Sequence, residues 1–248
     1  MECLSTSQST HECLATGEHH DSSKQGDATD RVNDPIVRHY EQCLAKHRYG
    51  HLAVDWPNAA DVVKRFEVMT QLFLGQGGSI LDFGCGVGLY YDYLRQHHPE
   101  YSAHYTALDI SDPFIARFQE KFPGVPALCQ DVLDTPLAQA YDFVVMNGVF
   151  TIKRTLPWET MWQYMQQTIA AVWPFTNKGL VFNVMSDQVQ WSRLDLFHLP
   201  FDVFEHWVHE VLECTVERIG EYGLYEYSVY VRHKIKRGSM IFSGRWSG

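Results

Sequence analysis

Three closely spaced glycines, Gly84, Gly86 and Gly88, constrain the fold of this chain more than any other feature. They follow a short apolar run, residues 79–83, and precede residues 89–97, whose apolar side chains recur at helical spacing. Glycine has no Cβ, so it permits a tight turn and lets a ligand approach the backbone closely. The sequence therefore predicts a strand, a glycine turn and a helix, with the turn exposed to a ligand.

The rest of the chain repeats the alternation of strand and helix. Further strands are expected at residues 104–109, 126–130, 142–147 and 179–185, and helices at residues 58–73, 111–122 and 158–173. Asn58 and Ser111 are the expected helix caps. A helix over residues 202–212, with Asp202 and Glu205 as a capping box, precedes two strands, residues 214–219 and 224–231. This order predicts an α/β fold with a doubly wound seven-stranded sheet, mostly parallel, ending in an antiparallel hairpin.

Composition divides the chain into three parts. Residues 1–33 contain no aromatic side chain and are predicted to form a disordered tail. Residues 34–238 are expected to form one domain, and residues 239–248 a short C-terminal tail. The sequence has no run of 18 apolar residues and no basic and apolar leader, so neither a membrane partner nor secretion is expected, and the cytoplasm is the predicted location.

Charge and cysteine content narrow the function further. The formal net charge of −10 argues against a nucleic-acid partner, which would require clustered Lys and Arg. Six cysteines form no C-x-x-C pair, so we expect reduced thiols and no metal centre. Nothing in the sequence decides between a monomer and a homodimer.

Two acids stand where the second and third strands are expected to end. Asp109 could accept hydrogen bonds from ribose hydroxyls at the carboxyl edge of the sheet, and Asp131 could accept from an adenine amine. The glycine spacing does not match the dinucleotide fingerprint, because Leu89 stands where its third glycine would be. A Walker lysine is also absent. The pattern therefore favours an adenosine-containing ligand and counts against NAD and nucleoside triphosphates.

Four segments resemble the motifs of class I S-adenosylmethionine-dependent methyltransferases, which have a Rossmann-like fold. They are ILDFGCGVG at 80–88, YTALDIS at 105–111, QDV at 130–132 and YDFVVMNG at 141–148. The resemblance covers residues 55–232, and residues 47–56 also look like a bacterial small-molecule subgroup. It implies S-adenosylmethionine as cofactor, bound by Asp82, Gly84, Cys85, Gly86, Gly88, Asp109, Ile110, Asp131, Val132 and Asn147. Within this set, Gly84 to Gly86 would line the methionyl part of the cofactor, and Asp109 would bind the ribose. The adenine would contact Ile110, Asp131 and Val132, and Asn147 would lie near the reactive methyl.

The methyl acceptor is less constrained. Asn147-Gly148 is followed by Val149-Phe150 instead of the two prolines and aromatic residue typical of DNA-base methyltransferases. With the acidic charge, this favours a small molecule or a sugar as partner, and a histidine candidate for the general base favours oxygen as the methylated atom. His198, in an aromatic-rich segment after the fifth strand, is the candidate general base. Other candidates for the acceptor site are His47, His51, Asp187, Trp56, Trp191, Tyr222, Tyr225, Arg65 and Arg193.

Three alternatives remain open at this point. The chain could methylate a protein or peptide, which an open groove around residues 186–201 would favour. It could be a non-catalytic module that binds the cofactor without turnover. It could also be an NAD-dependent oxidoreductase, which binding of a nicotinamide cofactor would reveal.

Overall fold

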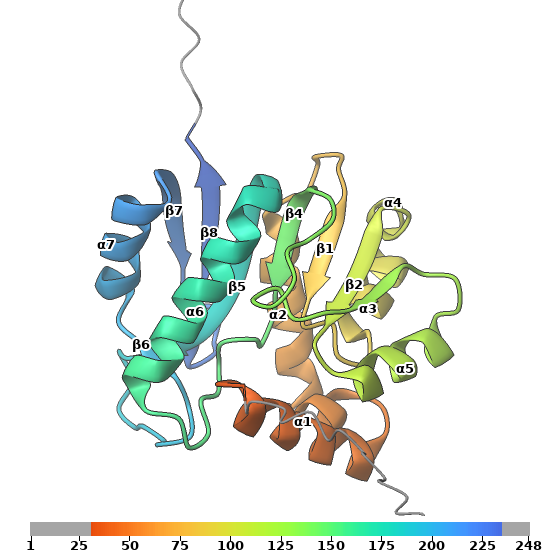
Figure 1. Cartoon of the computed structure of the whole chain (residues 1–248), viewed down its shortest axis with the longest axis horizontal. Helices are drawn as coiled ribbons and strands as arrows, with labels where there is room; N and C mark the ends of the chain where they lie inside the picture. The colour runs from red at the N-terminus through yellow and green to blue at the C-terminus, as the bar shows by residue number, and fades with distance from the viewer. Residues whose placement is uncertain (1–30, 235–248) are drawn as a thin grey trace, which may run out of the picture. The chain divides into compact units, whose positions relative to one another are not determined.

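The computed structural model describes residues 31–234. Residues 1–30 of the expected N-terminal tail and the whole expected C-terminal tail, residues 239–248, lie outside this range. Its centre is a twisted sheet in the order β3-β2-β1-β4-β5-β8-β7, with β6 paired to β5 (Figure 1). The strands are β1 (Ile80–Phe83), β2 (Tyr105–Asp109), β3 (Ala127–Cys129), β4 (Tyr141–Met146), β5 (Thr176–Ser186), β6 (His198–Leu199), β7 (Cys214–Ile219) and β8 (Glu226–His233). The expected doubly wound α/β sheet is confirmed.

Strand direction changes only at the end of the sheet. β1 pairs in parallel with β2 and β4, whereas β8 runs antiparallel between β5 and β7. The sheet has eight strands and not seven, because the two-residue strand β6 pairs in parallel with β5 through His198 opposite Met185. A two-residue strand has no periodicity of its own, so the sequence could not predict it.

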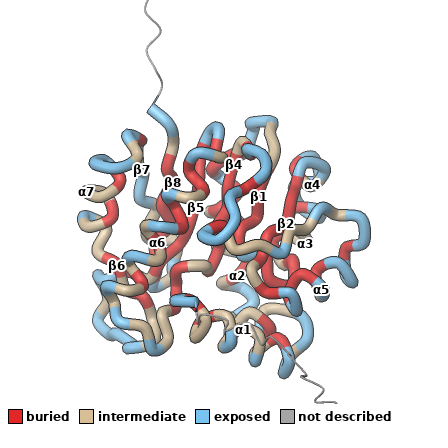
Figure 2. Tube along the Cα trace, in the orientation of Figure 1, coloured by how far each residue is buried: buried red, intermediate tan, exposed pale blue. Residues whose placement is uncertain are grey.

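Helices cover both faces of the sheet. The helices are α1 (Asp34–His47), α2 (Ala59–Gln71), α3 (Leu89–His97), α4 (Pro99–Ser102), α5 (Asp112–Lys121), α6 (Trp158–Val172) and α7 (Phe201–Val211), with short 3-10 turns η1 (His51–Val54) and η2 (Trp173–Phe175). Buried side chains of α2, α3 and α5 share one hydrophobic cluster, and those of α6 and α7 share the other. The strands alternate between the two, so Phe143 and Val145 belong to one cluster and Val144 and Met146 to the other. Figure 2 shows that the buried residues are concentrated in these central strands.

The helix starts were predicted with mixed success. Asn58 caps α2, since its side chain accepts from the amide of Ala60 at 2.9 Å. Ser111 precedes α5 but does not cap it, because its hydroxyl instead donates to Glu41 at 2.7 Å. The prediction that Asp202 and Glu205 form a capping box was wrong. Helix α7 begins at Phe201, directly after Pro200, and no side chain caps it.

Two described residues of the expected N-terminal tail contact the domain. Asn33, expected in the tail, is buried as the residue before α1 and donates to the hydroxyl of Tyr164 at 3.1 Å. Arg31 lies 3.0 Å from the carboxylate of Asp134. Within residues 31–234, no helix combines the length and apolarity needed to cross a bilayer.

Candidate active site

A pocket opens at the carboxyl ends of β1, β2 and β4. Here β2 and β3 lie on one side of β1, and β4 and the later strands lie on the other. Ligands bind at this switch point in open α/β sheets. The pocket contains about 1090 Å³ of empty space, part of it open to solvent. Helix α1 runs across this end of the sheet (Figure 1), and Ile36, Val37 and Tyr40 of that helix line the pocket.

The glycine turn forms the floor of the pocket. Gly84 and Gly86 have φ values of 76° and 54°, and both line the pocket. The amide of Gly84 donates to Leu108 at 2.7 Å, which ties the turn to β2. A Cβ on Gly86 would lie 2.9 Å from Val54, so only glycine leaves the floor and the facing wall this close.

Asp109, the last residue of β2, holds the glycine turn in place. Its two carboxylate oxygens accept from the amides of Gly86 at 2.9 Å and Ser111 at 3.0 Å. The side chain is buried, and burial raises the pKa of Asp109 to about 6 although these amides act to lower it. Each oxygen retains a lone pair that can accept a further hydrogen bond from a ligand.

A second buried acid, Asp82, lies beneath the turn. It accepts a hydrogen bond from the hydroxyl of Tyr105, and burial raises its pKa to about 7. Burial also raises the pKa of the neighbouring Cys85 thiol well above its usual range, with Asp109 adding to the effect. Cys85 is therefore an unreactive thiol lining the pocket.

Asn147 and Gly148 form the wall after β4. Neither polar atom of the buried Asn147 amide has a hydrogen-bond partner in the structure, although the residue lines the pocket. Such a group costs stability unless a ligand or water satisfies it. Gly148 has a φ of 81°, and a Cβ there would lie 2.8 Å from Trp56. Its amide donates to Asn183 at 2.7 Å, which fixes the turn after β4.

Contacts fasten α1 over the pocket on both sides. On the β4 side, the hydroxyl of Tyr40 donates to the carbonyl of Gly148 at 3.4 Å. On the other side, Glu41 accepts from Ser111, and Arg31 approaches Asp131 at 3.7 Å. Helix α1 is therefore part of the site and not an appendage to it.

The pocket gathers nine of the eleven residues predicted for the site. Its lining includes Asp82, Gly84, Cys85, Gly86, Asp109, Ile110, Asp131, Val132 and Asn147. Gly88 lies outside the lining, where a Cβ would meet Phe118 and Phe122 of the core. His198 is also outside it, on β6.

The predicted acceptor-site arginines have other partners. Arg65 forms a bidentate pair with the buried Glu226 at 2.8–3.0 Å, and its guanidinium stacks over Trp56 at 5.2 Å. Arg193 pairs with Asp195 at 2.6 Å. Trp56 does line the pocket, as the sequence suggested, and the stacked Arg65 supports its ring from behind.

Sequence reasoning missed the contribution of α1. Asn33, Ile36, Val37 and Tyr40 precede the first expected strand by many residues, and no motif marks them. The available signal was the spacing of Ile36, Val37, Tyr40 and Leu44, which places one apolar stripe on a helix. That stripe predicts a packed helix but does not reveal that it packs over a pocket.

Comparison with known proteins agrees with this geometry. Residues 80–172 match the family model described as a methyltransferase domain. This stretch of the chain therefore carries a methyltransferase domain. A provisionally named methyltransferase from Mycobacterium tuberculosis is 26% identical over 158 residues, which cover 62% of this chain and 92% of that protein. A malonyl-[acyl-carrier protein] O-methyltransferase from Anoxybacillus flavithermus is 26% identical over 118 residues, 46% of this chain and 45% of the relative.

Solved structures of methyltransferases share the fold. The magnesium protoporphyrin IX methyltransferase of Synechocystis with bound S-adenosylmethionine superposes with a TM-score of 0.57 at 17% identity, covering 84% of this chain and all of that chain. The N-methyltransferase NodS of Bradyrhizobium japonicum with S-adenosylhomocysteine gives 0.55 at 18% identity, covering 82% of this chain and 99% of that chain. At this level of identity, these neighbours show that the chain shares their fold.

The lining of the pocket fits S-adenosylmethionine, the ligand bound in the Synechocystis structure. The unpartnered amide of Asn147 offers both a donor and an acceptor to a polar group inside the pocket. The buried carboxylate of Asp109, at the end of β2, can accept hydrogen bonds from two vicinal hydroxyls. Because Gly84 and Gly86 have no Cβ, a ligand can approach their backbone closely. All three features belong to the same cavity.

Proposed function

We propose that this methyltransferase transfers the methyl group of S-adenosylmethionine to an oxygen of a small-molecule or sugar acceptor. The observation that carries the proposal is the cover of the pocket: α1 and the aromatic side chains of Tyr40 and Trp56 wall the cavity beside Asn147. Residues 186–201, where an open groove would favour a protein or peptide acceptor, do not line this pocket. The relative that is an O-methyltransferase supports oxygen as the methylated atom.

In this proposal, the residues of the pocket divide the cofactor among them. Gly84, Cys85 and Gly86 face its methionyl part, and Asp109 accepts from its ribose hydroxyls. Ile110, Asp131 and Val132 enclose the adenine, and Asn147 lies near the methyl group. This assignment rests on the lining of the pocket together with the motif resemblance.

Catalysis then depends mainly on positioning. S-adenosylmethionine supplies an already activated sulfonium methyl. The walls formed by Tyr40, Trp56 and Asn147 would orient the acceptor and exclude water from it. Holding two reactants in line contributes about 7–11 kcal/mol without any strong base.

His198 remains the proposed general base, for an acceptor that extends from the pocket toward β6, because His198 itself does not line the pocket. Its Nδ1 lies 2.6 Å from the carbonyl of Ser186, so Nδ1 carries the hydrogen and the lone pair of a neutral ring sits on Nε2. That Nε2 is buried without a hydrogen-bond partner. His198→Asn keeps a donor toward Ser186, so a 10²- to 10⁴-fold loss of kcat, about the range of general-base catalysis, would support the role. An unchanged kcat and pH profile would remove His198 from the mechanism.

The function is tested by turnover on matched acceptor panels. After calorimetry has established S-adenosylhomocysteine binding, with NADH as control, the chain is incubated with S-adenosylmethionine and small carboxylic acids, phenols or sugars. We expect release of S-adenosylhomocysteine with a member of this panel and none with a panel of peptides and proteins. Turnover on peptides alone would overturn the proposal, and cofactor binding without any turnover would indicate a binding module.

Asp109→Ala is expected to weaken S-adenosylhomocysteine binding by at least about 1.5–3 kcal/mol, the scale of one charge-assisted hydrogen bond. The variant lacks the carboxylate that accepts from the ribose and from the amides of Gly86 and Ser111. The floor of the pocket therefore also becomes less rigid. Calorimetric titration measures the change. Asp112→Ala, an exposed neighbour on α5, is the matched control and should leave the affinity unchanged.

Cofactor affinity should also depend on pH. Ribose hydroxyls donate to the ionised form of Asp109, whose pKa burial raises to about 6. Affinity should therefore be constant well above pH 6 and fall as the pH drops through about 6, by up to about tenfold per pH unit for one proton. Asp82 also lines the pocket, and burial raises its pKa to about 7. Cofactor affinity should therefore already begin to fall as the pH drops through about 7. Titrations between pH 5 and pH 8, with melting curves at each pH to confirm the folded state, measure it, and a flat profile would contradict the prediction.

A further inference from the structure

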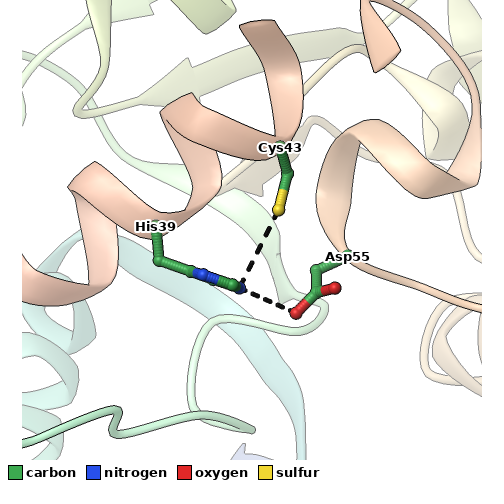
Figure 3. Close-up of side chains that lie close together, drawn as sticks. All are labelled: His39, Cys43 and Asp55. Carbon is green, nitrogen blue, oxygen red and sulfur yellow. Dashed lines mark hydrogen bonds and ion pairs between the residues drawn. The ribbon is translucent and has the colours of Figure 1, made fainter. Parts of the chain in front are cut away.

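Three side chains of metal-ligating types lie close together at one face of α1, outside the pocket lining. They are His39 and Cys43 on α1 and Asp55, which follows η1 (Figure 3). His39 Nε2 lies 2.7 Å from a carboxylate oxygen of Asp55 and 3.9 Å from the sulfur of Cys43. All three donor atoms lie within 4.8 Å of one another. In the part of the chain that the structure describes, residues 31–234, no other group of three such side chains was found.

The backbone brings these donors together from two elements. His39 and Cys43 are four residues apart on a helix, so their side chains share one face. The chain reverses after α1 through Arg48 and Gly50, both with positive φ, and places Asp55 opposite that face. Two donors are thus fixed by a helix, and the third by a turn.

We propose that His39, Cys43 and Asp55 bind a zinc ion. Imidazole nitrogen, thiolate sulfur and carboxylate oxygen are the donor types that zinc takes in proteins. Tetrahedral bonds of about 2.0–2.3 Å would separate the three donor atoms by about 3.3–3.6 Å, between the spacings of 2.7 Å from His39 to Asp55 and 3.9 Å from His39 to Cys43. Binding displaces the thiol proton of Cys43 to solvent and breaks the hydrogen bond between His39 and Asp55. One thiolate and one carboxylate then neutralise the charge of the ion.

Solvent exposure leaves the ion a route in and a place for a fourth ligand. The side chain of Asp55 is 49% exposed and that of His39 is 16% exposed. Three protein ligands and one water form the coordination that keeps an open position on zinc. No other side chain is needed to complete the site.

The site would join two walls of the pocket. His39 precedes Tyr40, and Asp55 lies between Val54 and Trp56, and these three neighbours all line the pocket. A bound ion replaces one hydrogen bond between α1 and the η1 segment with three coordinate bonds. S-adenosylhomocysteine should therefore bind the zinc-loaded chain more tightly than the metal-free chain.

Metal binding by the full-length chain, without a polyhistidine tag, tests the site directly. Zinc is titrated in competition with a chromophoric chelator, and cobalt is added separately because a thiolate bound to cobalt gives a charge-transfer absorption. We expect one zinc per chain, the thiolate absorption with cobalt, and no competition from magnesium, which prefers all-oxygen sites.

Variants decide whether these residues hold the ion. Cys43→Ser should abolish the thiolate absorption and weaken zinc binding at least about tenfold, and Asp55→Asn, at an exposed position, should weaken it without affecting the fold. Cys129→Ser removes another free cysteine, and His206→Asn removes a histidine that faces Glu210 on α7 without a cysteine; both should bind zinc as the unmodified chain does. His19→Asn/His20→Asn controls for binding by the N-terminal residues. Equal zinc affinity of the unmodified chain and Cys43→Ser, or a cobalt complex without thiolate absorption, would overturn the proposal.

Discussion

Arg65→Met is expected to lower the free energy of unfolding by about 3–5 kcal/mol, because it leaves a buried carboxylate without its cation. The side chain of Glu226 is 1% exposed and that of Arg65 is 15% exposed. Without Arg65, Glu226 keeps only the amide of Asn183 at 2.9 Å and the hydroxyl of Tyr222 at 3.2 Å. Methionine retains most of the apolar stem, so the loss is mainly electrostatic. Urea denaturation monitored by circular dichroism measures it.

Two further variants isolate the charge effect. The double variant Arg65→Met/Glu226→Gln removes both charges and should recover most of the stability, since a buried pair is often no better than its neutral replacement. Arg232→Met breaks an exposed pair with Glu217 and should cost no more than about 1 kcal/mol. Similar losses in Arg65→Met and Arg232→Met would contradict the prediction.

The same substitution should reach the pocket. Asn183 connects Glu226 to the amide of Gly148, and Arg65 stacks on Trp56. Both pocket walls therefore depend on the ion pair, and S-adenosylhomocysteine affinity should fall together with stability. Arg232→Met should leave that affinity unchanged.

Gly88→Ala is expected to destabilise the fold by about 2–5 kcal/mol. A non-glycine residue at its φ of 76° costs about 1–2 kcal/mol. The new Cβ would also lie 2.6 Å from the ring of Phe122 and 2.7 Å from that of Phe118, both buried, and overpacking of a core costs about 1–3 kcal/mol. Thermal and urea unfolding measure the loss.

Gly124→Ala is the matched control for this prediction. Gly124 has a φ of 86°, but no atom lies within 4 Å of a Cβ built there. It should therefore show the backbone cost alone, about 1–2 kcal/mol. If the two variants lose the same stability, the contact with the aromatic rings is not what requires glycine at position 88.

The sequence predicted the part of the site that is local in the chain. Each strand end and the turn after it are adjacent in sequence, so Gly84, Gly86, Asp109 and Asp131 could be placed at one edge of the sheet by topology alone. The pocket lining contains all four. Gly88 was predicted to bind the cofactor because it shares the motif, although its neighbours in space are core rings.

The parts that could not be predicted depend on tertiary contacts. Tyr40 reaches the pocket because α1 folds back over residues more than a hundred positions away, and no local pattern encodes that return. Arg65 was considered a partner for an acidic acceptor because Glu226, its actual partner, lies 161 residues away. Ser111 stands at the position of a helix cap, but its hydroxyl donates a hydrogen bond to Glu41 instead.

The pocket exists only when distant segments of the chain meet, since residues as far apart as Asn33 and Tyr164 both line it. An unfolded chain has no such site, so a ligand of the pocket binds the native state alone. At a concentration one hundred times its Kd, such a ligand adds about 2.7 kcal/mol to the stability of the folded chain. At such a concentration, the proposed cofactor S-adenosylmethionine would therefore reduce how often the chain unfolds and becomes accessible to proteases, and would link the abundance of the protein to that of the cofactor.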